Sequence, residues 1–187
     1  MKIARLTAVA ATALALTVAA VAAAPSAEAR TAAQITAEGS RTLQLLQARE
    51  PASRRFARHA RGVLVFPSIY KAGLVFGAES GNGVLFVKGR AVGYYNLSGG
   101  SWGLQAGAQK FSYVVFFMND SALRYLRRSA GFAVGTGPSI VVIDKGGSAE
   151  ANSTTIAKDA YAFPFNGEGL MADLSLQGTK ISPIHPH

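Results

Sequence analysis

The stretch from residue 72 to residue 120 sets glycines among alternating apolar residues and ends in an uninterrupted apolar run. Gly73 and Gly77 are four residues apart, and so are Gly103 and Gly107. Glycine normally weakens a strand, so repeated glycines in strand-like sequence indicate sharp curvature, or the close approach of another backbone or a ligand. This stretch therefore predicts a tightly curved β-sheet around which the rest of the chain is organised.

Further strand-like segments lie on both sides of this stretch. Apolar runs and alternation predict strands at residues 63–66, 72–79, 84–88, 91–97, 102–108, 111–118, 132–134, 140–143, 157–163 and 170–176. Pro67 is expected to end the first strand, and residues 80–83 (Ser-Gly-Asn-Gly) and 89–90 are expected to form turns. Many short strands separated by turns favour a mainly β (α+β) fold with an antiparallel, strongly curved sheet or barrel-like core.

Helical periodicity precedes the sheet. It predicts one helix over residues 31–49 and a second that begins at Pro51, a residue suited to the first position of a helix. A short helix is inserted later, with Asn119 or Asp120 as its N-cap and an end near Ser129. We expect residues 30–187 to form a single domain, with a helical lead-in at 30–61 and a β core at 62–182.

Residues 1–29 have the pattern of a secretory signal peptide: a short basic start, an apolar region at 6–24 and a small-x-small cleavage site at 27–29. A membrane span is the alternative, but the segment is mostly alanine and lacks a stop-transfer flank. We therefore expect an exported protein, periplasmic or extracellular, with at most peripheral membrane contact. The chain has no cysteine, which excludes disulfides, thiolate metal sites and thiol catalysis.

The basic residues form two clusters in a chain with a net charge of +9. The candidate lipid-binding residues are Arg54, Arg55, Arg58, Arg61 and Lys71 in and after the second helix, and Arg124, Arg127 and Arg128 in the inserted helix. Near an anionic bilayer each such charge can contribute about 1 kcal/mol. The alternative is a pair of solvated helix faces that keep a basic protein soluble.

Several segments together resemble the SYLF domain family. They are Gly-Val-Leu-Val-Phe-Pro at 62–67, Lys-Ala-Gly-Leu-Val-Phe-Gly at 71–77, Leu-Gln-Ala-Gly-Ala-Gln-Lys at 104–110, Met-Asn-Asp at 118–120, Lys-Asp-Ala-Tyr-Ala-Phe at 158–163 and residues 169–178. The resemblance covers about residues 37–184. It implies an antiparallel β core with helices and a role in binding phospholipids. In some family members it also implies actin association, but a signal peptide argues against actin as a partner of this chain.

The two arginine clusters together with the resemblance therefore predict a non-enzymatic protein that docks reversibly on an anionic phospholipid membrane surface. No cofactor, metal site or catalytic residue is expected: the histidines lie in a basic helix and the tail, and the carboxylates are scattered. Export argues against nucleic acid as a partner, and no stacking platform accompanies the basic clusters. Two alternatives remain open, a barrel that carries a small apolar ligand or lipid, and an envelope structural or stress-related interaction protein.

Overall fold

The computed structural model describes residues 30–73, 76–102, 107–133, 135–143, 158–169 and 178–187. In these ranges the chain forms an eight-stranded sheet with the order β5-β8-β3-β2-β1-β4-β7-β6. The strands are β1 (Gly62–Gly73), β2 (Phe76–Val87), β3 (Arg90–Trp102), β4 (Gly107–Phe117), β5 (Phe132–Ala133), β6 (Ile140–Val142), β7 (Ala160–Gly169) and β8 (Thr179–Ile184). All neighbouring strands are antiparallel except β6 and β7, which are parallel.

Two helices, α2 (Ala32–Arg49) and α3 (Ser53–His59), precede the sheet, and α4 (Asp120–Arg128) is inserted after β4. Thr31 starts α2 with a capping box, because its hydroxyl accepts from Gln34 N at 3.2 Å while Gln34 Oε1 accepts from Thr31 N at 2.8 Å. Asn119 caps α4 through a 2.8 Å bond from Ala122 N to its Oδ1. The predicted fold class is confirmed: a curled, mainly antiparallel sheet preceded by two helices and interrupted by one.

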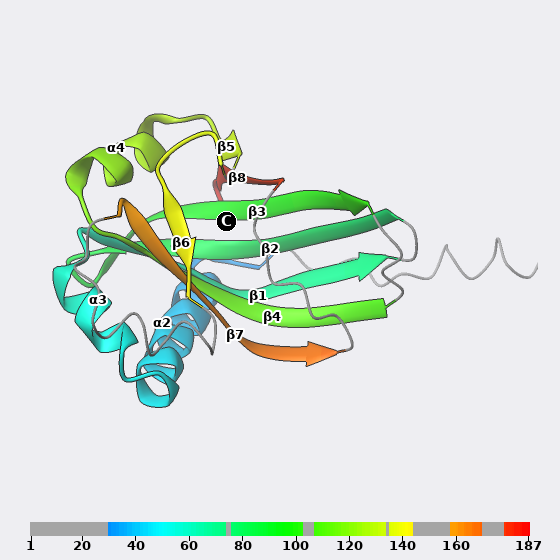
Figure 1. Ribbon diagram of the computed structural model, residues 1–187, viewed down its shortest axis with the longest axis horizontal. Coiled ribbons are helices and arrows are strands. Elements are labelled where there is room, and N and C mark those ends of the chain that lie inside the picture. The colour runs from blue at the N-terminus through cyan, green and yellow to red at the C-terminus, as the bar shows by residue number, and fades with distance from the viewer. Residues whose placement is uncertain (1–29, 74–75, 103–106, 134, 144–157, 170–177) are drawn as a thin grey trace, which may run out of the picture.

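The helices cover both faces of the sheet at one end. Figure 1 shows α2 and α3 on one side and α4 on the other, while the strands extend beyond all three helices at the opposite end. Val65, Val84 and Phe116 lie in the apolar cluster beneath α2 and α3. Leu64 and Phe117 belong to the cluster on the other, inner face, together with α4. Because both faces are buried here, β4 reads as a continuous apolar run rather than as an alternation.

The predicted turn at residues 80–83 is wrong, and so is the strand end at Pro67. Residues 80–83 lie inside β2 and pair with β3, and Ser80 also pairs with Tyr70 of β1. Strand β1 continues through Pro67 with a register shift between Phe66 and Ile69. A Cβ on Gly81 would stand 2.6 Å from Ser68 O, and one on Gly83 would stand 2.6 Å from Val65 O. The glycines therefore let β2 approach the irregular part of β1, where a side chain would not fit.

A row of polar residues crosses the inner face of the sheet beyond the apolar cluster. Direct cross-strand neighbours in this row are Thr179, Gly99, Glu79, Lys71 and Gln109, on β8, β3, β2, β1 and β4. The four side chains in it are buried, with Lys71 3% exposed. Lys71 therefore does not belong to an exposed basic surface.

The predicted strand at residues 170–176 and the predicted signal peptide at 1–29 lie outside the described residues. Within those that are described, no helix is long and apolar enough to cross a membrane.

Candidate functional site

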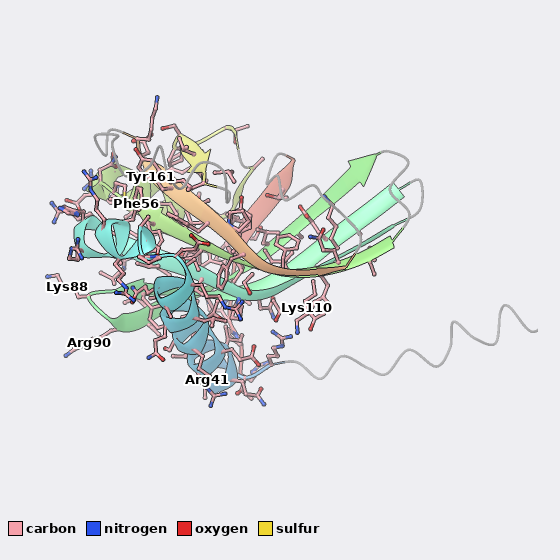
Figure 2. All side chains as sticks on the ribbon, turned by 60° about the horizontal axis from the view of Figure 1, so that its bottom comes forward. Arg41, Phe56, Lys88, Arg90, Lys110 and Tyr161 are labelled. Carbon is pink, nitrogen blue, oxygen red and sulfur yellow. The ribbon has the colours of Figure 1, made fainter. Side chains whose placement is uncertain are left out.

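The arginines of α3 are positioned by one aromatic anchor. Phe56 is 2% exposed, and its ring centroid lies 4.6 Å from that of Tyr161 and 5.3 Å from that of Phe163. Figure 2 shows Phe56 and Tyr161 beside each other where α3 meets the sheet. With this face of the short helix fixed in the core, Arg54 and Arg58 are exposed. The seven-residue helix is thus held by tertiary packing rather than by its own propensity.

The second arginine cluster is positioned in the same way by α4. Ala122, Leu123 and Leu126 are buried against the inner cluster, so Arg124, Arg127 and Arg128 are left exposed on the other side of the helix. Burial raises the pKa of the Tyr95 hydroxyl, and the charge of Arg127 partly offsets this rise. Arg127 therefore acts electrostatically on the inner face of β3, to which Tyr95 belongs.

Asp159 locks the start of α4 to the start of β7. Its carboxylate accepts from Asn119 Nδ2 at 2.8 Å, and from Ser139 N at 2.9 Å and Ser139 Oγ at 3.0 Å. These hydrogen bonds lower the pKa of Asp159, and the bond from the backbone N–H of Ser139 contributes most. The N-cap residue of α4 is thus held in place by a carboxylate that accepts three hydrogen bonds.

The two arginine clusters lie at the same end of the sheet, on either side of it (Figure 1). Arg61 Nε, just after α3, lies 3.9 Å from Asp120 Oδ1 at the start of α4. The turn between β2 and β3 reaches the same end, because Phe86 pairs with Val63 near the start of β1. We call this region the basic end; its cations are Arg54, Arg55, Arg58, Arg61, Lys88, Arg90, Arg124, Arg127 and Arg128.

Figure 2 shows Lys88 and Arg90 near α3, whereas Arg41 and Lys110 lie elsewhere. Sequence reasoning missed Lys88 and Arg90 as members of this surface. The signal was present, because Gly89 between two apolar strands suits the second position of a two-residue hairpin turn, but the sequence pattern predicts the turn one residue later. In the structure Lys88 and Gly89 form the turn, with φ values of 50° and 76°.

A groove lies beside these cations. It has a volume of about 370 Å³. Its lining consists of Ser40, Leu43, Gln44 and Gln47 of α2, Ala57, Ala60 and Arg61 in and after α3, Gly62 and Val63 of β1, Phe86 of β2, and Lys88 and Gly89 of the β2–β3 turn. Its apolar lining is continuous with the apolar cluster beneath α2 and α3. An apolar recess with cations on its border suits an amphiphilic anion better than a purely polar ligand.

No group of three or more His, Asp or Glu side chains that could hold a metal ion occurs in the described ranges. The inner face at the basic end is filled by completely buried side chains, among them Leu64, Val115 and Phe117. The accessible features of this end therefore include the cations and the groove.

The fold and this end define a class of protein, a helix-flanked, curled β-domain with a cationic end beside an apolar groove. A family model named Ysc84 and described as "Las17-binding protein actin regulator" matches residues 98–185, which run from β3 to β8. The match confirms the resemblance noted above: residues 98–185 are similar to the SYLF domain family. SYLF domains in general bind lipids and are a non-catalytic family. No curated protein matches the chain.

Proposed function

We propose that this protein docks reversibly on anionic phospholipid membranes through its basic end. The observation that carries the proposal is that α3 and α4, which are far apart in sequence, bring their arginines to one end of the sheet (Figure 1). The β2–β3 turn adds two further cations there. Scattered surface charge would serve solubility equally well, whereas charge gathered at one end favours binding to an extended anionic surface.

The number of cations suits reversible attachment. A basic side chain near an anionic bilayer contributes about 1 kcal/mol, so four or five of the nine reaching the surface would give about 4–5 kcal/mol. Asp120 and Asp159 lie among them, and both already have partners. Binding of this size is weak enough to reverse and is sensitive to salt, because the Debye length is about 8 Å at physiological ionic strength.

Export is part of the proposal. Residues 1–29 would act as the signal peptide, and the docked protein would be periplasmic or extracellular, attached peripherally. The description of the matching family names actin regulation. An exported protein would not meet actin, so the lipid surface is the partner proposed for this chain, with neither nucleic acid nor a catalytic step involved.

Co-sedimentation with anionic and zwitterionic vesicles across a salt series tests the proposal. We expect binding to anionic vesicles that falls steeply as salt rises, and loss of binding when Arg54, Arg58 and Arg124 are changed together to Glu. The matched control carries Arg41→Glu and Lys110→Glu, two exposed cations outside the basic end. Binding that is absent, or that responds to the control as strongly per charge as to the basic-end variant, would show the docking surface to be wrong.

A further inference from the structure

We infer that the groove beside the basic end binds one anionic phospholipid molecule, with an acyl chain along its apolar lining and the phosphate between Arg61 and Lys88. The inference rests on the proposed function, because it assigns a specific lipid site to the surface that docks. It differs from docking by charge alone, since it requires a single amphiphile to enter the protein.

The lining has the shape and chemistry that an acyl chain requires. Leu43 of α2 and Phe86 of β2 supply apolar walls, and Val63 extends them from β1. The small side chains of Ala57 and Ala60 leave the recess open between the helices and the sheet. Its volume of about 370 Å³ lies within the range of small-molecule sites. Each methylene that leaves water for such a lining raises affinity about fourfold.

The cations lie where the phosphate of that lipid would be. Arg61 and Lys88 both border the groove, from the segment after α3 and from the β2–β3 turn. The nearest carboxylate to Arg61 is Asp120, at 3.9 Å with both side chains more than half exposed, so this pair is weak and can be exchanged for a phosphate. A guanidinium and an ammonium on the border of one groove can provide directional and point-charge contacts to one phosphate group.

The backbone conformation of Lys88 indicates that its side chain has a function at the groove. Lys88 has a φ of 50°, the left-handed region that disfavours residues with a Cβ, and it is the one non-glycine residue of the described ranges with a positive φ. A two-residue turn of this kind prefers Asn-Gly or Asp-Gly. Neither preferred residue would place a cation at the groove, whereas lysine does so despite the unfavourable backbone.

The test measures binding of dodecyl phosphate, below its micelle concentration, to the purified protein by calorimetry and native mass spectrometry. We expect one molecule to bind, and inorganic phosphate or dodecyltrimethylammonium to bind at least tenfold more weakly. Lys88→Asn suits the turn better than lysine and should remain folded, yet it should weaken dodecyl phosphate at least fivefold. Its matched control, Lys110→Gln, removes an exposed cation outside both the groove and the basic end and should change affinity less than twofold.

A second pair of variants tests the acyl chain. Ala57→Trp fills the groove and should abolish dodecyl phosphate binding, while Ala78→Trp, at an exposed position on β2, should leave it intact. A lipid site in the groove is ruled out if anionic vesicles bind but dodecyl phosphate does not, or if Lys88→Asn and Lys110→Gln have equal effects. If inorganic phosphate binds with the same affinity as dodecyl phosphate, the acyl chain makes no contribution to binding. If neither vesicles nor dodecyl phosphate bind, docking itself is also wrong.

Discussion

Gly39 lies in the middle of α2, and we predict that Gly39→Ala destabilises the protein although alanine favours helices. A Cβ at this position would press directly on Cγ1 of Val84 in β2 and lie 3.4 Å from Phe86 Cε2. Val84 is completely buried in a central strand, and its β-branched side chain has little freedom to turn away. Residue 39 is therefore glycine because the helix backbone rests on the sheet there.

The expected size follows from two opposing terms. Alanine in place of glycine gains about 1 kcal/mol of helix propensity. Overpacking a well-filled core costs about 1–3 kcal/mol, and here the contact is direct, so we expect a net loss of about 1–2 kcal/mol. Val84→Ala alone should cost about 2–3 kcal/mol from lost burial and the cavity left behind. It also removes the atom that blocks residue 39.

Combining the two changes separates the cost of overpacking from the gain in helix propensity. In the Val84→Ala background, Gly39→Ala should stabilise the protein by about 1 kcal/mol, a reversal of sign that gives a coupling of about 2–3 kcal/mol. Urea denaturation at equilibrium measures all four corners of this cycle. Ala37→Gly, at an exposed position of the same helix, calibrates the propensity term. If Gly39→Ala stabilises the unmodified protein by about 1 kcal/mol, the close approach of α2 to β2 is wrong.

Three further predictions concern other parts of the molecule. Gln109→Leu should raise the free energy of unfolding by about 1 kcal/mol in urea denaturation, because Oε1 of this buried side chain has no hydrogen-bond partner among the described residues; a loss would reveal a partner. Asp159→Asn should lower stability at neutral pH and have no effect in strong acid. The lowered pKa of Asp159 stabilises the fold above the unfolded pKa of about 3.9, and this contribution is lost as pH falls through the folded value; an effect unchanged from pH 7 to pH 2 would contradict it. Phe56→Ala should cost about 3–5 kcal/mol and weaken binding to anionic vesicles, since α3 loses its anchor; vesicle binding that survives a released α3 would place the docking surface elsewhere.

Much of the helical part could be predicted because its signals are local. The capping residue Asn119 and the apolar spacing of α4 lie within one short segment, so the helix and its exposed arginines follow from sequence. The fold class, a curled sheet, could also be predicted, because the sequence has many short strands and glycines. That α3 and α4 would meet at one end of the sheet depends on the pairing of β1 with β4, which no local pattern reveals.

The position of Lys71 shows why the rest could not be predicted. Leu64 and Phe66 face the interior of β1, and uninterrupted alternation would place Lys71 on the opposite face. The register shift before Ile69 changes this phase, so Ile69 and Lys71 face inward. Pro67 signals this irregularity, because proline has no N–H for a strand ladder, although the sequence pattern predicts a strand end there. The groove was equally hidden, since its lining comes from three segments that only tertiary packing brings together.

The edges of the sheet suggest how copies of this protein avoid pairing with one another when many are bound to one surface. An open sheet offers unpaired backbone groups at its edges, where another chain can add a strand and begin to aggregate. Here the outermost strands, β5 and β6, have two and three residues. The strands next to them carry Pro183 in β8 and Pro164 in β7, which have no N–H to offer. Within the described ranges, this curled, open sheet thus has short edge strands with prolines beside them, which disfavour the addition of a strand from a neighbouring copy.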